Sequence, residues 1–225
     1  MREKPIVAID GPSGAGKSTV ARGVANSLNF AFIDTGALYR AVAWLAKNEG
    51  IDWEDGPALG ELAEAHRFAF DPKGELSIDG DRVGTRIRTP EMSLGASHVA
   101  KHEEVRRALS HVQRRLSESG GVVLEGSDIG TEVFPDAEMK FFLTASTRVR
   151  ARRRFEELRG LGEEVTLAEV ERDQRQRDAQ DRERAVSPLR QAEDAEVINC
   201  DNLAAGEVID LLVSKISVNF PLTSN

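Results

Sequence analysis

The sequence of 225 residues has a single cysteine, few aromatic residues, no long apolar run and no excess of basic charge. The lone Cys200 cannot form a disulfide within the chain, which favours a reducing compartment. No apolar run approaches the roughly 18 residues of a membrane helix, and the opening MREKPIVAID lacks the apolar stretch of a secretory signal. These absences predict a cytoplasmic protein that does not enter a membrane.

The balance of charge is acidic, with a formal net charge of −8. This argues against a nucleic-acid-binding protein, because neutralising phosphates requires a basic surface. The four histidines, His66, His98, His102 and His111, lack the spacing of a metal site with acidic partners. The length suits one main domain with an insertion, or two small domains.

Short apolar runs typical of buried strands alternate with segments of helical periodicity. The expected strands lie at residues 5–10, 30–34, 121–126, 139–145 and 195–201. This order predicts an α/β fold, a five-stranded parallel sheet with flanking helices. Residues 66–83, HRFAFDPKGELSIDGDRV, alternate apolar and polar around two turn signals, which predicts a small antiparallel insertion.

The segment GPSGAGKS, from Gly11 to Ser18, matches G-x-x-x-x-G-K-[ST] between a predicted strand and a predicted helix. Its glycines let backbone N–H groups turn toward phosphate oxygens, and the helix N-terminus adds positive charge. Lys17 is expected to reach the β- and γ-phosphates, and Ser18 to bind Mg²⁺ held with the nucleotide. The motif therefore predicts a nucleoside triphosphate site.

Other features narrow the class of P-loop protein. The Asn-Lys-x-Asp motif of GTPases is missing, and VVLEG at 122–126 is a poor Walker B strand, so a small kinase fits best. DTGALYRA places Arg40 one turn into a helix, after a strand end that faces the ligand crevice of a parallel sheet. The alternative is a helix cap at Asp34 or Thr35 beside a surface arginine.

Residues 171–184 form a highly charged stretch, and Thr166 with Glu169 predicts a helix start just before it. Arg177, Asp181 and Arg184 have the spacing of one helix face. Because the stretch lacks an apolar stripe, we expect the helix to stand away from the core as a lid that excludes water from phosphoryl transfer. The alternative is an exposed helix laced with weak ion pairs.

A second basic group, RVRARRR at residues 148–154, precedes this helix. Arg150 and Arg154 are one helical turn apart, so they are candidates to face the phosphates together. The sequence does not choose among the five arginines of the group.

The motifs IDGPSGAGKST, FIDTGALYRA, IRTPEMSLGASHVA, VRRAL, EGSDIGTEVFPDA and DRERAVSPL occur in this order between Ile9 and about Leu189. In this respect the chain resembles the bacterial cytidylate (CMP) kinases, P-loop nucleoside monophosphate kinases. The resemblance implies transfer of the γ-phosphoryl group of ATP to CMP or dCMP, with Mg²⁺, giving CDP or dCDP. It also implies a monomer built of a core (1–36, 112–146 and 190–225), a CMP-binding insertion (37–111) and a lid (147–189).

The resemblance also implies site residues. It assigns ATP to Gly11, Pro12, Ser13, Gly14, Ala15, Gly16, Lys17, Ser18 and Thr19. It places the cytosine against Thr35, Ser97, Arg106, Asp128 and Arg184, the ribose against Arg177 and Asp181, and the acceptor phosphate against Arg40. The residues expected to act in catalysis are Lys17, Arg40, Asp128 and Arg184. Arginine can donate to the acceptor atoms of cytosine while aspartate accepts from its amino group, and uracil would mismatch the aspartate.

The chain departs from the family pattern at Ser127, where Glu-Gly-Arg-Asp is usual and EGSD stands here. The expected arginine helps hold the acceptor phosphate, and a serine offers neither its charge nor its fork. Three interpretations are open: another arginine substitutes, CMP binds more weakly, or the acceptor preference has shifted. We expect weaker acceptor binding with the reaction class retained. The rival functions are a P-loop kinase for another small acceptor, such as shikimate, and an ATP-binding regulator with impaired transfer.

Overall fold

A parallel sheet of five strands forms the centre of the computed structural model, which describes residues 3–160 and 162–221. The strands are β1 (Ile6–Asp10), β2 (Ala31–Asp34), β6 (Val122–Glu125), β7 (Met139–Thr144) and β8 (Glu196–Asn199), in the order β2-β6-β1-β7-β8. Every pair is parallel, which confirms the predicted fold class. Residues 1–2, 161 and 222–225 of the predicted core and lid lie outside the described residues.

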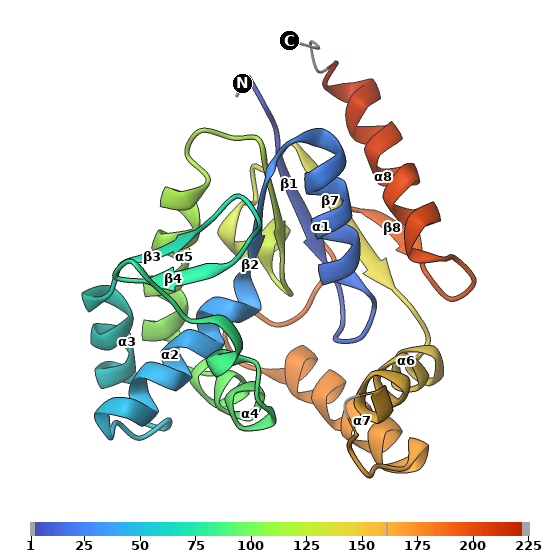
Figure 1. The fold of residues 1–225 in the computed structure, drawn as a ribbon. Coiled ribbons are helices and arrows are strands. Elements are labelled where there is room, and N and C mark those ends of the chain that lie inside the picture. The colour runs from blue at the N-terminus through green and yellow to red at the C-terminus, as the bar shows by residue number, and fades with distance from the viewer. Residues whose placement is uncertain (1–2, 161, 222–225) are drawn as a thin grey trace.

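The strand β1 shows why the sheet is buried on both faces. Val7 and Ile9 pack in one apolar cluster with residues of α1 (Lys17–Leu28) and α8 (Ala205–Asn219). Ile6 and Ala8, which point to the other face because side chains alternate along a strand, pack with Ile129 and its neighbours. Figure 1 shows α1 and α8 together on one side of the strands. A continuous apolar run is the expected signature of such a strand.

The segment between β2 and β6 contains its own apolar cluster. It runs through α2 (Thr35–Glu49), α3 (Gly56–Ala65), β3 (Phe68–Phe70), β4 (Leu76–Ile78), β5 (Asp81–Arg82), the short helix η1 (Gly84–Ile87), α4 (Pro90–Val99) and α5 (Glu103–Leu116). The strands β3, β4 and β5 form an antiparallel sheet, as predicted. The helices α3 and α4 were not predicted; both begin with a proline in the first turn, after caps by Asp55 and Thr89.

Two helices, α6 (Thr147–Gly160) and α7 (Leu167–Glu183), connect β7 to the last strand. The predicted capping box of Thr166 and Glu169 is present at the start of α7. The expected lid helix α7 contributes no residue to the three apolar clusters of the described chain, but it is not isolated. The helix buries Val170, Gln174 and Asp178, mostly polar residues one turn apart, against its neighbours. Figure 1 shows α6 and α7 packed together beyond the sheet, at the end where α2 and α4 also lie.

Candidate functional site

The P-loop joins β1 to α1 at the carboxyl end of the central strand. Gly11, Gly14 and Gly16 all have positive φ angles, 145°, 77° and 94°. A side chain at Gly11 would also collide with the backbone oxygen of Leu143, since a Cβ there would lie 2.0 Å away. The loop thus requires glycine for its shape. The ammonium of Lys17 donates to the carbonyl oxygen of Pro12 at 3.0 Å, which folds the side chain back over the loop.

Acidic side chains surround this lysine. Burial lowers the pKa of Lys17, whereas the carboxylate of Glu125 opposes that shift. Burial raises the pKa of Glu125, and repulsion by Asp34 raises it further. The Glu125 carboxylate accepts a hydrogen bond of 2.5 Å from the hydroxyl of Ser18. The first residues of α1 therefore meet a buried carboxylate from the end of β6.

Asp10 is a second buried carboxylate at this edge, and it lies just before the P-loop. Its two oxygens accept hydrogen bonds from the backbone N–H groups of Ile129 and Gly130, at 2.8 and 2.7 Å. Burial raises its pKa to about 6; those two hydrogen bonds oppose the shift, and repulsion by Asp128 adds to it. Asp10 thereby anchors the segment that begins at Asp128.

The start of α2 carries the predicted arginine. Asp34 caps the helix by accepting from the N–H of Ala37 at 2.9 Å, and its other oxygen accepts from Arg40 at 2.9 Å. The capping role that the sequence allowed for Asp34 is therefore present beside the ion pair. Thr35 is buried, and its hydroxyl donates to the carbonyl oxygen of Glu125 at 2.7 Å. The Nε atom of Arg40 is buried without a hydrogen-bond partner among the described residues.

A buried ion pair joins the insertion to the core. Arg106 of α5 donates to Asp128 at 2.8 Å, and both side chains are at most 10% exposed. The same guanidinium donates to the carbonyl oxygen of Ala100 at 2.7 Å and lies over the ring of Tyr39, 5.4 Å from its centroid. Burial raises the pKa of Tyr39 to about 12, although Arg106 opposes the shift. The structure thus pairs the two residues that the sequence suggested for reading a base.

Arg184 reaches the same cluster from the far end of α7. Its guanidinium donates to the hydroxyl of Ser127 at 2.8 Å and lies 3.5 Å from a carboxylate oxygen of Asp181. The Ser127 hydroxyl in turn donates to Asp128 at 3.3 Å. Burial lowers the pKa of Arg184, and repulsion by Arg106 lowers it further. A chain of polar contacts thus runs from Asp181 to Arg106.

Part of the predicted helix face is wrong. α7 ends at Glu183, and Arg184 is already extended, with φ −59° and ψ 138°, so it does not continue the face of Arg177 and Asp181. The charges of the two helical residues nonetheless act on the P-loop lysine. Arg177 lowers the pKa of Lys17, and Asp181 raises it.

Ser97 is a predicted site residue whose hydrogen bond lies within its own helix and not within the site. Its hydroxyl donates to the carbonyl oxygen of Ser93 within α4 at 3.3 Å. Among the described residues, no hydrogen bond or ion pair joins it to the cluster of Arg106 and Asp128.

The sequence left open which arginines of residues 148–154 face the phosphates, and the structure gives Arg150 and Arg154 different partners. Arg150 is only 2% exposed and forms an ion pair with Asp178 at 2.6 Å. Arg154 pairs instead with Glu157 at 2.8 Å on the exposed side of α6.

Sequence reasoning missed Asp10, Glu125 and Tyr39 as members of the site. Asp10 and Glu125 each end an apolar strand of a parallel sheet, and a carboxylate at that position is a readable signal. Tyr39 carries no such signal, because an aromatic residue in an amphipathic helix is typical of a core.

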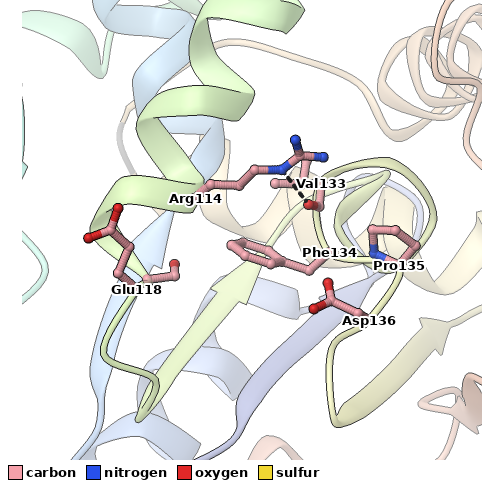
Figure 2. Close-up of a pocket in the computed structure, with 7 residues that line it drawn as sticks. Arg114, Glu118, Val133, Phe134, Pro135 and Asp136 are labelled. Atoms are coloured by element: carbon pink, nitrogen blue, oxygen red, sulfur yellow. Dashed lines mark hydrogen bonds between the residues drawn. The ribbon is translucent and has the colours of Figure 1, made fainter. Parts of the chain in front are cut away.

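A separate pocket of about 380 Å³ lies between the end of α5 and the loop before β7. Figure 2 shows Arg114 donating to the carbonyl oxygen of Val133 above Phe134, with Glu118 and Asp136 among the lining residues. This pocket adjoins the start of β7, whereas the P-loop lies at the carboxyl ends of the strands. It is therefore separate from the site described above.

Two features are absent from the described part of the chain. No helix there is long and apolar enough to cross a membrane. No group of three or more His, Cys, Asp or Glu side chains there is arranged to hold a metal ion.

Comparisons with known proteins all point to the same family. The model of the cytidylate kinase family matches residues 7–218. A cytidylate kinase from Citrifermentans bemidjiense is 47% identical over 214 residues, covering 94% of this chain and 92% of that protein. A cytidylate kinase from Pelotomaculum thermopropionicum is 46% identical over 221 residues, covering 96% and 98%.

A third relative is longer. A bifunctional pantoate ligase/cytidylate kinase from a Synechococcus species is 46% identical over 216 residues, which are 93% of this chain. The chain spans 40% of the length of that fused protein. With a family match over nearly its whole length and two relatives of matching size, this chain belongs to the cytidylate kinase family.

Proposed function

We propose that the chain transfers the γ-phosphoryl group of ATP to CMP or dCMP, giving ADP and CDP or dCDP. The observation that carries this proposal is the juxtaposition of two clusters at one edge of the sheet. A P-loop with a half-buried lysine adjoins a buried Arg106–Asp128 pair, and Asp10 contacts the backbone directly after Asp128. A donor site and a base-reading site are thus held against each other.

On the donor side, residues Gly11 to Thr19 bind the phosphates of ATP. Backbone N–H groups of the loop and the N-terminus of α1 supply positive potential to the phosphate oxygens. Lys17 adds a charge that its acidic neighbours hold near the loop. On binding, its ammonium exchanges the Pro12 carbonyl for phosphate oxygens.

The residues near Ser18 suit a magnesium ion carried by the nucleotide. The Ser18 hydroxyl and the Glu125 carboxylate are hard oxygen donors 2.5 Å apart, the ligand type that Mg²⁺ prefers. Ser18 would bind the ion directly, and Glu125 would orient the hydroxyl or a bound water. Mg²⁺ typically takes most of its remaining ligands from water and nucleotide phosphates, and when bound it neutralises charge on the β- and γ-phosphates.

On the acceptor side, Arg106 and Asp128 read the cytosine. The arginine donates to the acceptor atoms of the base and the aspartate accepts from its amino group. Thr35, Ser97 and Arg184 complete the base pocket. Since uracil presents a carbonyl where cytosine has its amino group, UMP would leave polar groups unpaired at a cost of about 1–3 kcal/mol each.

The sugar and phosphate of the acceptor contact the remaining residues. Arg177 and Asp181 of α7 bind the ribose. Arg40 binds the acceptor phosphate, and its buried Nε without a partner is a donor that a phosphate oxygen would satisfy. The reaction then needs no general base, because the attacking phosphate oxygen is already ionised at neutral pH. Lys17, Arg40 and Arg184 promote transfer by positioning the reactants and neutralising charge.

The proposal extends to organisation and partners. Residues 1–36, 112–146 and 190–225 form the core, residues 37–111 the CMP-binding insertion, and residues 147–189 the lid. The protein acts as a monomer in the cytoplasm on ATP and CMP or dCMP, without nucleic acid.

A panel of acceptors tests this function. ADP release from ATP and Mg²⁺ is followed with CMP, dCMP, UMP, AMP, shikimate or no acceptor. We expect CMP and dCMP to stimulate ADP release at least about tenfold more than UMP. Leaving one or two polar groups unpaired with UMP would account for a factor of this size. Equal rates with every acceptor, or a preference for shikimate, would contradict the proposal.

A further inference from the structure

The P-loop has a second side, formed by backbone carbonyl groups. When successive N–H groups of such a loop turn toward a phosphate, carbonyl oxygens are left facing the surrounding protein, where they need donors. The carbonyl oxygen of Ser13 accepts two hydrogen bonds, from Arg150 at 2.9 Å and from Gln174 at 3.1 Å. Arg150 belongs to α6 and Gln174 to α7, so both lid helices contact the middle of the P-loop.

The guanidinium of Arg150 is fully occupied by protein. Its Nε donates to the carbonyl oxygen of Ala145, and its Nη1 and Nη2 donate to Ser13, to Thr147 and twice to Asp178. These contacts use all five N–H donors that an arginine has. Arg150 is therefore a buried structural residue beside the P-loop, and it has no N–H donor left for a phosphate.

Gln174 and Asp178 complete the arrangement from one face of α7. The amide of Gln174 donates to Asp178 at 3.3 Å as well as to Ser13, so the two acceptors share its NH₂ group. Packing against the loop is close. A Cβ added at Gly14, which has φ 77°, would lie 3.1 Å from the Cβ of Arg150 and 3.4 Å from Oε1 of Gln174. The backbone of the P-loop lies directly against these side chains.

We propose that Arg150, Gln174 and Asp178 form a positioning unit, the Ser13 clamp, which holds the P-loop in its phosphate-binding conformation. Asp178 fixes Arg150, and Arg150 and Gln174 together fix the Ser13 carbonyl. With that carbonyl held outward, the N–H groups of the loop stay turned toward the donor phosphates. Affinity for the donor nucleotide therefore depends on residues that do not touch it. This inference rests on the proposed function only for the identity of the donor, an adenine nucleotide.

Gln174→Met tests the clamp without leaving a buried charge unpaired. Methionine keeps the length of the side chain and removes the amide that donates to Ser13. The matched control is Gln176→Met, the same change at an exposed position of the same helix. Binding of ADP with Mg²⁺ is measured by calorimetry on the full chain, and KM is measured for both substrates.

For Gln174→Met we expect ADP to bind about 3–10-fold more weakly, the equivalent of one hydrogen bond. KM for ATP should rise by a similar factor. KM for CMP should stay within about twofold, because no hydrogen bond among the described residues joins Arg106 or Asp128 to the clamp. The control should match the unmodified chain. Unchanged ADP binding in a folded Gln174→Met variant, or equal rises in both KM values, would overturn the proposal.

Arg150→Lys supplies a second measurement, with Arg152→Lys as its control on the exposed side of α6. Lysine keeps the charge beside Asp178 but cannot bridge Ser13 and Asp178 as the guanidinium does. We expect Arg150→Lys to bind ADP about tenfold more weakly, or weaker still, and Arg152→Lys to bind ADP as the unmodified chain does. A normal ADP dissociation constant in Arg150→Lys would count against the clamp, and if this variant does not fold, Gln174→Met decides alone.

The two proposals fail differently. A chain that binds ADP but does not phosphorylate CMP contradicts the proposed function, and the ADP measurements still decide the clamp. Failure of the unmodified chain to bind ADP would overturn both.

Discussion

Ser127 is the residue at which this chain departs from the pattern it resembles, and the structure gives it two partners. Its hydroxyl accepts from Arg184 and donates to Asp128, so it bridges a lid residue and the proposed base reader. A hydroxyl supplies no charge to an acceptor phosphate. An arginine at position 127 would add that charge.

Ser127→Arg should therefore lower KM for CMP by about tenfold, the equivalent of one charge-assisted hydrogen bond. Steady-state kinetics at saturating ATP measures this. Ser127→Gln, a long neutral side chain, is the control and should not lower KM. If neither KM nor kcat changes in Ser127→Arg, the serine does not limit acceptor binding.

Asp10 makes stability depend on pH. Burial raises its pKa from 3.8 to about 6, so the folded state binds this proton more tightly than the unfolded state does. Its carboxylate therefore penalises folding above pH 6, and the penalty disappears as the pH falls through 6 toward 4. Relative to Asp10→Asn, the free energy of unfolding of the unmodified chain should rise between pH 7.5 and 5, by about 1.4 kcal/mol.

Denaturant unfolding of both proteins at the two pH values checks this prediction. Taking the difference between the two chains cancels the titration of groups that are the same in both. A difference that stays constant with pH, or that falls toward pH 5, would show that Asp10 ionises normally in the folded protein.

At the scale of single elements, α7 depends on its ends and its polar contacts more than on apolar burial. Val170 is the only apolar side chain among its buried residues. The capping box at Thr166 should therefore matter for this helix. Thr166→Ala removes the hydrogen bond to the N–H of Glu169 and should destabilise α7 by about 1 kcal/mol.

Hydrogen exchange measured residue by residue is the test. Amides in the first turns of α7 should exchange about fivefold faster in Thr166→Ala, while those of α1 keep the rates of the unmodified chain. Equal acceleration in both helices would mean that the cap stabilises the whole protein and not this element.

The elements also show which patterns a sequence reveals. Strands β1 and β6 and helix α1 were predicted because a strand buried on both faces is continuously apolar and α1 buries its apolar residues at helical spacing. The clamp residues were not predicted. A charged side chain is normally expected to be exposed to solvent, and the burial of Arg150 and Asp178 follows from contacts between two different helices. The end of α7 was misplaced because Ser187 and Pro188 mark a stop without saying how far before them the helix breaks.

At the scale of the whole molecule, the sheet brings together parts that are far apart in the chain. In Figure 1 the helices α2 and α4 and the pair α6 and α7 lie at the same end of the strands. The P-loop lies at that end, in contact with α6 and α7 through Ser13. The P-loop side of this site was predictable from a local motif, whereas the meeting of Arg106, Asp128 and Arg184 depends on three separate segments and came from the family resemblance.

The central claim is that a phosphoryl group passes directly from the donor in the P-loop to CMP. The most direct measurement follows the label from ATP labelled at its γ-phosphate, in the presence of Mg²⁺ and CMP. We expect labelled CDP in equal amount to the ADP formed, with little labelled inorganic phosphate, because the proposed lid would exclude water. Label found in inorganic phosphate alone, or no transfer although ADP binds, would contradict it.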